Sequence, residues 1–468
     1  MRRALCWIRR DLRLSDHRAL FEACSNYDEV AVVFVYDENI LNALTNQSDR
    51  RVTFIMQSLL EVDAGLRDAG SSLIVRHGDP VTEIHELSTQ LHVNAVVTAR
   101  DFEPYALQRD GAVLDSLAKI GVEFVAVKDQ VIFEKGEILS KSDEPFRVFT
   151  PYSRCWLEKF ERQFDAMKFE SDLKKLIPSE RVMEFSGGLS YDQIGFIECS
   201  PWITAGETAG KLALQDFEQK IDAYKESRDT PSANGTSFLS THLRFGTISI
   251  REAVRMAARH DSEGARKWLM ELVWREFYQD ILANHPRVAT TTFNPSYEKL
   301  VWPGLLDNFE AWKSGMTGFP IVDAAMRCFA ETGWMHNRLR MVVASFLTKD
   351  LLVDYRKGEE YFASLLMDFD FASNNGGWQW AASVGCDAQP YFRIFNPYLQ
   401  SQKFDSEGTF IRRWVPELAD LDSNEIHKPS QFEVEMRGYP MPIVDHDHQR
   451  KLAIAMFEQV RKSSCQMN

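Results

Sequence analysis

The sequence has few cysteines and no long hydrophobic run, and both shortages narrow the classes of protein to which it can belong. Its 468 residues contain 7 cysteines, an odd number with no Cys-x-x-Cys pair, so neither a disulfide framework nor a zinc or iron–sulfur centre is supported. Nowhere do about 18 uncharged apolar residues follow one another, as a membrane-spanning helix requires. The basic start MRRALCWIRRDLR also lacks a sustained apolar run. We therefore expect a soluble, cytoplasmic protein with no membrane partner.

Acidic residues outnumber basic residues in this sequence. Lys and Arg total 54 against 68 Asp and Glu, which gives a formal net charge of −14. Because phosphate binding needs Lys and Arg to displace condensed counterions, this balance excludes a general affinity for nucleic acid, and a DNA site must be a local basic patch. The usual phosphate cradles are also missing, since no G-x-G-x-x-G follows the first apolar run and no G-x-x-x-x-G-K-[ST] occurs.

The first part of the chain alternates short apolar runs with amphipathic stretches, such as the helix-like stretch at 50–70. The apolar runs are ALCWIR, VAVVFVYD (30–37), SLIVRHG (72–78), NAVVTAR (94–100) and VEFVAV (122–127). Strands at this spacing are typical of β-α-β units, so residues 1–130 are predicted to form a Rossmann-like α/β domain with a five-stranded parallel sheet. Open sheets bind ligands beyond the carboxyl ends of their strands, where the sequence places Arg9, Arg10, Asp37, Arg100 and Asp101.

The remaining sequence divides into an irregular segment and a helical segment. Residues 131–205 contain scattered Pro and Gly and no lasting period, which indicates a long interdomain linker. From residue 206 the periods become helical and strands are hard to find, which predicts an all-α domain over 206–468. Of the 11 tryptophans, 8 lie between residues 268 and 414. That bias favours a function in this half over general packing.

The segment WLMELVWREFYQDIL (268–282) carries an aromatic stripe with an acid inside it. Trp268, Glu271, Arg275 and Tyr278 are three or four residues apart and share one helical face, with Trp274 at its margin. Such a stripe is more often core than site. A glutamate buried there without a partner costs several kcal/mol, so its pKa tends to rise and it can donate a proton or a hydrogen bond. Both interpretations stay open.

The stretch 332–380 mixes aromatic and charged residues in a way that few cores need. It contains Trp334, Trp378 and Trp380 beside Asn337, Arg338, Arg340, Asp368, Asp370, Asn374 and Asn375. Its Asn-Asn-Gly-Gly sequence predicts a turn. Because buried charges must be paired or must hold a ligand, the stretch is either a core with satisfied polar groups or a site for a flat, polar-edged ligand. On a helix, Trp378 and Trp380 would diverge by about 200° and could not serve one surface.

Four motifs in the second half resemble one known family. TGFPIVDAAMR (317–327), TGWMHNRLRM (332–341), NNGGWQW (374–380) and YFRIFNP (391–397) are similar to the photolyase/cryptochrome flavoproteins, most closely the bacterial class I cyclobutane pyrimidine dimer photolyases. The similarity runs from the first predicted strand to about residue 445. It implies an all-α domain that binds FAD, and a monomer that repairs single- or double-stranded damaged DNA. In the implied mechanism, excited reduced flavin gives one electron to a flipped-out dimer, the cyclobutane bonds break, and the electron returns.

The resemblance also implies roles for individual residues. The damaged bases would be contacted by Glu271, Trp274, Asn337, Met341 and Trp380. FAD would be held by Tyr224, Thr236, Ser237, Leu239, Ser240, Trp268, Arg275, Asn337, Arg340, Asp368, Asp370 and Asn374. DNA phosphates would be held by Arg228, Arg338, Arg393 and Lys403. From the residues alone, the hydroxyls of TSFLS (236–240) are helix caps or a phosphate site, and each basic residue is a surface charge or a phosphate contact.

The chain departs from the family in the relay that carries electrons from the surface to the flavin. Three tryptophans form this relay in photolyases, and Trp378 and Trp302 match its inner and outer members, but Tyr355 stands in the middle. A phenol is harder to oxidise without losing its proton. Either Tyr355 substitutes with coupled deprotonation, or another aromatic such as Trp312 or Trp380 carries the electron.

The predicted α/β domain would hold an antenna chromophore in this family. RDFEPYALQRD (100–110) is similar to the deazaflavin-binding version, whereas members that bind methenyltetrahydrofolate carry Asn-Glu where Tyr105 and Ala106 stand. We therefore expect a deazaflavin, or no antenna, with contacts from Arg10, Asp101 and Glu103. In the alternative interpretation RDFEP only ends a strand and starts a helix. The His-Asp-His cluster at 446–448 lies in a polar tail, and we expect no metal there.

Two other functions remain in contention. A cryptochrome-like light sensor would signal through a protein partner, but Asn374 is the residue type of photolyases, where signalling relatives carry an acid or a thiol. A (6-4) photolyase would need a catalytic histidine in the cavity, and the central motif offers only His336, beside Asn337.

Overall fold

The computed structural model describes residues 1–161, 168–187 and 190–465. These form two compact units: the first comprises Met1–Pro145, Thr150–Asp222 and Ser237–Ala283, and the second comprises Phe146–Phe149, Ala223–Thr236 and Asn284–Asn468. This division differs from the predicted boundaries (1–130, 131–205 and 206–468), because residues 207–222 and 237–283, which are largely helical, pack in the unit of the sheet. Parts of the predicted linker, residues 162–167 and 188–189, lie outside the described residues. None of the helices described combines the length and apolar character needed to cross a bilayer.

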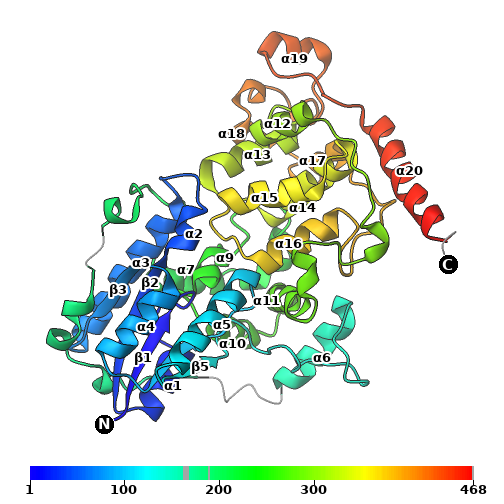
Figure 1. Cartoon of the computed structure of the whole chain (residues 1–468). Helices are drawn as coiled ribbons and strands as arrows, with labels where there is room; N and C mark the ends of the chain where they lie inside the picture. The colour runs from blue at the N-terminus through cyan, green and yellow to red at the C-terminus, as the bar shows by residue number, and fades with distance from the viewer. Residues whose placement is uncertain (162–167, 188–189, 466–468) are drawn as a thin grey trace. The chain divides into compact units, whose positions relative to one another are not determined.

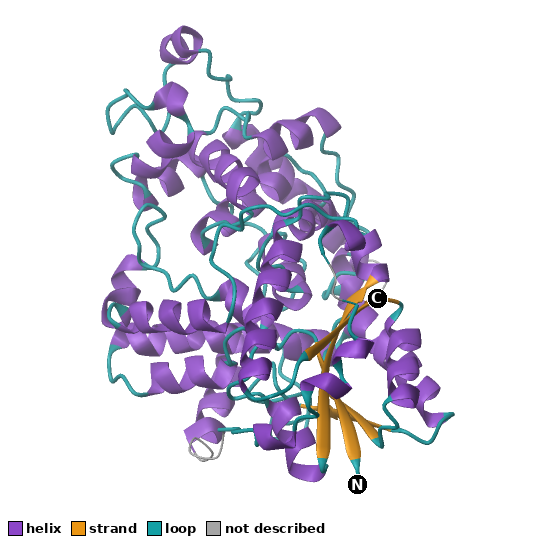
Figure 2. Cartoon of the chain, turned by 90° about the vertical axis from the view of Figure 1, so that its left-hand side faces the viewer, coloured by secondary structure: helices purple, strands orange, loops and turns teal. Residues whose placement is uncertain are grey.

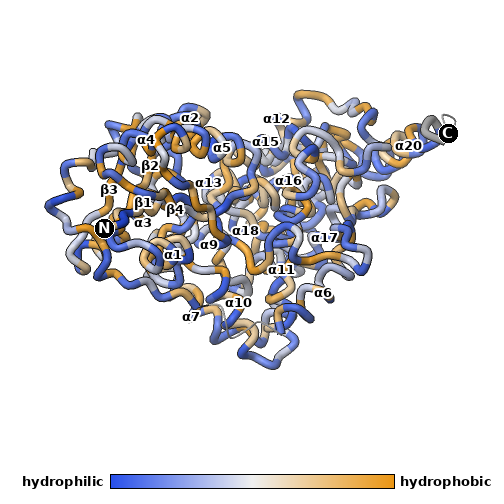
Figure 3. Tube along the Cα trace, turned by 60° about the horizontal axis from the view of Figure 1, so that its bottom comes forward, coloured by the Kyte–Doolittle hydropathy of each residue, from blue (hydrophilic) through white to orange (hydrophobic). Residues whose placement is uncertain are grey.

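The first unit is built on the predicted five-stranded parallel sheet, drawn in orange in Figure 2. Its strands are β1 (Arg3–Ile8), β2 (Glu29–Asp37), β3 (Leu73–Gly78), β4 (Ala95–Ala99) and β5 (Glu123–Val127), in the order β3-β2-β1-β4-β5. Trp7 of β1 pairs with Val33 of β2 on one side and with Thr98 of β4 on the other. The strands are mainly hydrophobic in Figure 3, as expected of a parallel sheet covered on both faces. The predicted Rossmann-like fold is confirmed.

Helices cover both faces of this sheet (Figure 1). They are α1 (Arg18–Asn26), α2 (Glu38–Asn42), α3 (Arg50–Asp68), α4 (Pro80–Gln90) and α5 (Pro104–Ala118). Leu87 of α4 and Val113 of α5 join one buried cluster with the sheet residues Leu5 and Val96. Right-handed crossovers place α1 and α3 on the opposite face. The order of the strands reverses between β1 and β4, and this switch point is where open sheets bind ligands.

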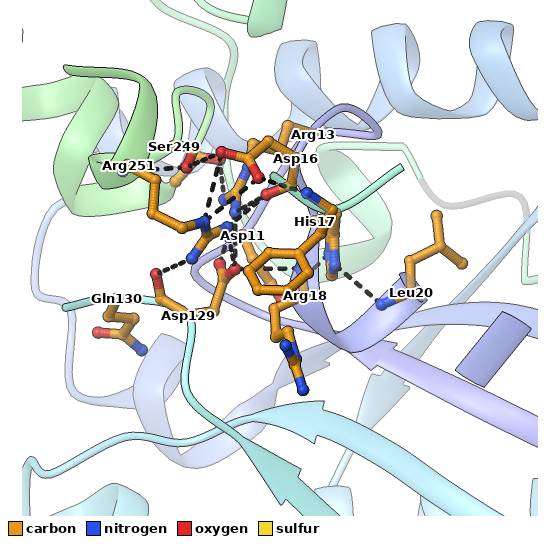
Figure 4. Close-up of polar contacts among 12 residues, drawn as sticks. Asp11, Arg13, Asp16, His17, Arg18, Leu20, Asp129, Gln130, Ser249 and Arg251 are labelled. Carbon is orange, nitrogen blue, oxygen red and sulfur yellow. Dashed lines mark hydrogen bonds and ion pairs between the residues drawn. The ribbon is translucent and has the colours of Figure 1, made fainter. Parts of the chain in front are cut away.

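Further helices that belong mainly to the first unit are α6 (Phe149–Glu161), α7 (Glu207–Glu218), α9 (Ser240–Phe245), α10 (Ile250–Ala258) and α11 (Glu263–Asn284). A buried ionic cluster joins α10 to the loop after β1 and to residue 129 (Figure 4). There the Asp129 carboxylate accepts hydrogen bonds from Arg13 at 2.7 and 2.8 Å and from Arg251 at 2.7 Å. Arg251 also pairs with Asp16 at 3.3 Å. Because buried charges are stable only when paired, this cluster explains why α10 packs with the sheet.

The described part of the second unit contains helices and no strand. Its helices are α8 (Tyr224–Ser227), α12 (Leu306–Ser314), α13 (Pro320–Thr332), α14 (Asn337–Ser345), α15 (Tyr355–Leu365), α16 (Phe371–Ala381), α17 (Pro397–Phe404), α18 (Thr409–Trp414), α19 (Gln431–Arg437) and α20 (His446–Cys465). Their core includes Trp312, Phe329, Phe346 and Trp378. The predicted all-α C-terminal domain is confirmed for this unit (Figure 1).

Candidate functional site

The ion pair between Arg340 and Asp368 is the charged centre of the stretch singled out in the sequence. Arg340 on α14 donates from Nε to the Met335 carbonyl and from Nη2 to Asp368 Oδ2, both at 2.8 Å. Asp368 is only 8% exposed, and its second oxygen, Oδ1, has no hydrogen-bond partner among the described residues. A buried acceptor without a donor is costly, so this oxygen is suited to accept a hydrogen bond from a ligand.

The predicted turn at Asn374–Gly377 is wrong, because these residues lie inside helix α16. Asp370 is the N-cap of this helix, and its Oδ1 accepts from the backbone N–H of Ser373 at 3.0 Å and from the Ser373 hydroxyl at 2.9 Å. The cap starts the helix before the glycines, and the burial of Trp378 in the core holds the later turns in place. Trp378 is 3% exposed, whereas Trp380 is half-buried at the edge of the core.

A cavity of about 250 Å³ lies beside α15 and α16. Asn374, Asn375, Tyr355 and Glu359 line it. The Asn374 amide donates to the Glu359 carbonyl at 3.0 Å, and the Asn375 amide donates to the Glu359 carboxyl at 2.9 Å. Burial raises the pKa of Glu359 to about 7. Sequence reasoning missed Glu359; its one signal was an acid four residues after Tyr355, which on a helix shares the same face.

The hydroxyl-rich loop 236–240 contains a buried hydroxyl that helix capping does not account for. Thr236, in the second unit, has a buried Oγ1 with no hydrogen-bond partner among the described residues. Gly235 packs so closely that a Cβ there would lie 2.6 Å from the Ser227 carbonyl oxygen. Ser237 Oγ accepts from the Leu239 N–H at 3.4 Å, but no side chain caps α9, which begins at Ser240. Capping therefore does not explain the Thr236 hydroxyl. Tyr224, also assigned to FAD, is buried at the start of α8.

Helix α11 of the first unit divides its predicted residues between core and surface. Trp268 is buried against Phe217, with ring centroids 4.9 Å apart. Arg275 donates to the backbone carbonyls of Gln130 at 2.7 Å and Leu243 at 3.5 Å. Glu271 and Trp274 are half-buried.

Glu276 is a buried acid of α11 that sequence reasoning did not select. Its carboxylate accepts hydrogen bonds from the N–H groups of Ile132 at 2.6 Å and Phe133 at 3.0 Å, and from Trp156 Nε1 at 2.6 Å. Burial raises the pKa of Glu276 to about 7, although these donors act to lower it. Its partners lie more than a hundred residues away in the chain, so no local pattern announces them.

Helix α14 carries two of the five residues that the resemblance assigns to the damaged bases. Asn337 is its first residue and is exposed, while Met341, one turn later, is half-buried. Arg338 Nη1 lies 3.9 Å from the Met341 sulfur. An exposed amide and a polarizable thioether on neighbouring turns can contact the edge and face of an aromatic ligand.

The structure brings two of the four predicted phosphate contacts together around the Phe404 ring. The Arg338 guanidinium lies 4.3 Å and the Lys403 amine 5.2 Å from its centroid. Arg338 also donates to Asp229 Oδ1 at 2.8 Å, which offsets part of its charge. Arg228 lies 3.8 Å from the same carboxylate, and Arg393 is exposed.

The predicted electron relay has two steps, from Trp302 to Tyr355 and from Tyr355 to Trp378, and among the residues that the structure describes the rings are in contact only in the first. Trp302 and Tyr355 are in edge contact, with ring centroids 6.4 Å apart. The described rings include no contact between Tyr355 and Trp378; the tryptophan in contact with Trp378 is Trp312, at 6.1 Å.

At the switch point of the sheet, the predicted antenna residues bind one another. Arg10 donates to Asp101 at 3.3 Å and to Glu103 at 2.8 Å, and Arg244 donates to Glu103 at 3.1 Å. Burial acts to raise the pKa of Asp101, but Arg10, Arg9 and Arg244 outweigh it and hold that pKa well below its usual range. Asp101 also accepts from the Phe102 N–H at 2.7 Å, but no side chain caps α5, which begins at Pro104.

The histidine cluster at 446–448 joins helix α20 to the rest of the second unit. His446 Nδ1 lies 2.5 Å from Asp350 Oδ1, and both residues are buried. This pair accounts for His446 by packing and electrostatics.

Comparisons with known proteins agree with this geometry. A family profile described as DNA photolyase matches residues 4–169, and one described as the FAD binding domain of DNA photolyase matches residues 268–459. A deoxyribodipyrimidine photo-lyase of Vibrio cholerae is 38% identical over 471 residues, which cover 97% of this chain and 99% of the relative. The crystal structure of a bacterial class III photolyase from Agrobacterium tumefaciens matches with a TM-score of 0.87 at 34% identity, over 99% of this chain and 98% of that one. A cryptochrome from Synechocystis matches with a TM-score of 0.85 at 28% identity, over 97% and 99%.

Proposed function

The chain belongs to the DNA photolyase family, and we propose that it acts as a deoxyribodipyrimidine photo-lyase, which uses light to split pyrimidine dimers in damaged DNA. The observation that carries this proposal is the 38% identity to a relative of that name, which extends over 97% of the chain. The two orphaned acceptors of the second unit, described above, supply independent support for a bound polar cofactor.

The residues of the second unit fit FAD. Asp368 Oδ1 and Thr236 Oγ1 are buried polar atoms whose partners are missing among the described residues, and a nucleotide with ring, ribose and phosphate groups can satisfy both. Tyr224, Arg340, Asp370 and Asn374 would complete its contacts in this unit. By the resemblance, Ser237, Leu239, Ser240, Trp268 and Arg275 are further proposed contacts. When bound and reduced, FAD supplies under blue light the electron that opens the cyclobutane ring.

The remaining proposed roles concern the lesion and its backbone. Glu271 and Asn337 offer hydrogen-bonding groups to the flipped-out bases, Trp274 and Trp380 offer stacking faces, and Met341 packs against them. The phosphates are held by Arg228, Arg338, Arg393 and Lys403, four cations on a chain whose net charge is −14. The paired charge of Arg338 makes it a weaker electrostatic contact than an unpaired arginine would be.

Three finer points complete the proposal. The antenna is a deazaflavin or is absent, with Arg10, Asp101 and Glu103 at the switch point of the sheet as its contacts. The protein acts as a cytoplasmic monomer on single- or double-stranded lesions. The Arg10 side chain already has two carboxylate partners, so an antenna chromophore has to be recognised beside this ion cluster.

Because the chain also matches a cryptochrome, light signalling is the alternative function to repair. A TM-score of 0.85 to that protein against 0.87 to a photolyase shows that the fold does not separate repair from signalling. Asn374 separates them by resemblance, because it is the residue type of photolyases. The identity of 38% to a repair enzyme, against 28% to the cryptochrome, favours repair.

Repair of a defined lesion tests the proposal. The purified chain with reduced FAD is mixed with an oligonucleotide that contains one cyclobutane dimer, and restored pyrimidines are counted after blue light and after darkness. Light-dependent repair of this substrate, with none of a (6-4) lesion, is expected. Asn337→Ala removes one proposed hydrogen bond to the bases and should lower repair about 2- to 10-fold, the equivalent of about 0.5–1.5 kcal/mol. The exposed control Asn424→Ala should not. A cofactor-loaded protein that repairs neither lesion would contradict the proposal.

A further inference from the structure

Trp378 has no aromatic contact with Tyr355, the residue at the middle position of the relay. The edge of the Trp378 ring meets the backbone of α15 at Gly358, where a Cβ would lie 2.2 Å from Trp378 Cη2. Tyr355 is 2% exposed and makes its contact with Trp302 instead, at 6.4 Å. The phenol ring of Tyr355 is smaller than the indole ring found at this position in photolyases. The electron route through Tyr355 therefore lacks a ring contact on the side toward Trp378.

Among the described residues, two rings are in contact with Trp378. Phe362 lies 5.1 Å from it, centroid to centroid, and Trp312 lies 6.1 Å from it, both edge to face. A phenyl ring is not oxidised by an indole radical, so Phe362 cannot pass on the electron vacancy. Trp312 can, because its ring is chemically the same as that of Trp378. Its indole N–H donates to the Val343 carbonyl at 3.2 Å, an acceptor that is not a base, so Trp312 can be oxidised and refilled without a proton transfer.

Beyond Trp312 the next oxidisable ring is Tyr361. The two centroids are 5.8 Å apart in an edge-to-face contact. Tyr361 is half-buried, and its hydroxyl lies 3.4 Å from the Lys313 carbonyl. A tyrosine must lose its proton when it is oxidised, and a residue that is partly exposed to solvent, as Tyr361 is, can release that proton to water. Trp378, Trp312 and Tyr361 therefore form a chain from the core to the solvent in which every step is a ring contact.

We propose that electrons reach Trp378 through Trp312, with Tyr361 as the outer donor, and that Tyr355 is not the relay residue. This proposal rests on the proposed function, because it concerns the light-driven reduction of the flavin before repair. Trp378 gives one electron to the light-excited oxidised flavin, Trp312 gives one electron to the Trp378 radical cation, and Tyr361 gives one electron to the Trp312 radical cation. Tyr361 releases its phenolic proton to water in that step. The neutral tyrosyl radical is restored by one hydrogen atom from an external thiol, which becomes a thiyl radical.

The test compares four single variants of the FAD-loaded chain: Trp312→Phe, Tyr361→Phe, Tyr355→Phe and, as a matched control, Trp414→Phe on α18. Two quantities are measured, the rate of flavin photoreduction with a thiol present and the tyrosyl radical detected by transient absorption and electron spin resonance. Trp312→Phe should slow photoreduction about tenfold or more and remove the tyrosyl signal. Tyr361→Phe should remove the tyrosyl signal while tryptophan oxidation persists. Tyr355→Phe and Trp414→Phe should leave both quantities within about twofold of the parent chain.

Tyr355→Phe that abolishes photoreduction, or a tyrosyl signal that survives in Tyr361→Phe, would overturn the route. Trp312 is fully buried, so Trp312→Phe is checked for folding by its thermal unfolding; if it does not fold, Tyr361→Phe, which loses only a hydroxyl, decides. Repair by chemically reduced enzyme is measured in parallel and should be equal in all folded variants. Failure of repair in the parent chain would count against the proposed function, whereas normal repair with unaltered photoreduction in Trp312→Phe would count against the route alone.

Discussion

Replacing Asp368 with asparagine keeps the size of the side chain and reverses the hydrogen-bonding character of one of its two oxygen positions. Oδ2 accepts from Arg340 at 2.8 Å, and Oδ1 has no partner among the described residues. Because a guanidinium can only donate, the amide oxygen of Asp368→Asn must take the position next to Arg340. The amide NH₂ then occupies the position of Oδ1, where it can donate but cannot accept.

The size of the effect follows from what each position does. If a donor of FAD binds Oδ1, the variant loses one charge-assisted hydrogen bond of about 1.5–3 kcal/mol, which corresponds to about a 10- to 150-fold higher Kd. The stability of the FAD-free chain should change less. The Arg340 side chain is 27% exposed, so solvent screens the pair, and its contribution to the free energy of unfolding is about 1 kcal/mol.

Titration of the FAD-free protein with FAD, followed by quenching of the flavin fluorescence, measures the Kd. The matched control is Asp420→Asn, which alters another Asp–Arg pair of the same unit, but one whose Asp420 side chain is 74% exposed next to Arg437. The control should bind FAD like the parent chain and unfold at the same denaturant midpoint. A Kd for Asp368→Asn within twofold of the parent value would refute the assignment of Oδ1 to the cofactor.

Three other substitutions test the packing and the charges. Asp129→Asn removes the charge that two buried arginines share, and should lower the free energy of unfolding by about 3–5 kcal/mol in a denaturant titration; a loss below about 1 kcal/mol would contradict that pairing. Gly358→Ala places a Cβ 2.2 Å from Trp378 Cη2, so overpacking of about 1–3 kcal/mol should outweigh the helix gain of about 1 kcal/mol. The control Gly111→Ala, with nothing within 4 Å, should not destabilise α5. Burial raises the pKa of Glu359 from its ordinary 4.5 to about 7, so the folded chain binds this proton more tightly and the free energy of unfolding falls as pH rises between those values. Glu359→Gln should remove up to roughly 3 kcal/mol of that fall, at 1.36 kcal/mol per pH unit. If the free energies of unfolding of the two proteins changed with pH in parallel, the raised pKa of Glu359 would be refuted.

The local hydrophobic pattern of the sequence predicted those strands and helices whose buried residues recur at regular spacing within a short segment. The runs at 30–37 and 72–78 became β2 and β3 within one residue of their predicted bounds. The three- and four-residue spacing in 268–282 likewise identified a helix correctly, since this segment lies in α11. At Asn374–Gly377 the local signal failed, because two glycines indicate a turn in isolation, while the Asp370 cap and the buried Trp378 ring continue the helix through them.

The amino-acid sequence alone determined the fold class and, through its motifs, the family, because hydrophobic period and motif identity are properties of neighbouring residues. Only the tertiary structure decided which charges are buried and which rings touch. Glu271 and Glu276 are both acids on one helix, and the burial of Glu276 depends on donors at Ile132, Phe133 and Trp156 that the chain brings in from far away. In the same way, the electron route turns on whether Trp378 meets Tyr355 or Trp312, and that contact is set by how three helices pack, which no spacing along the sequence records.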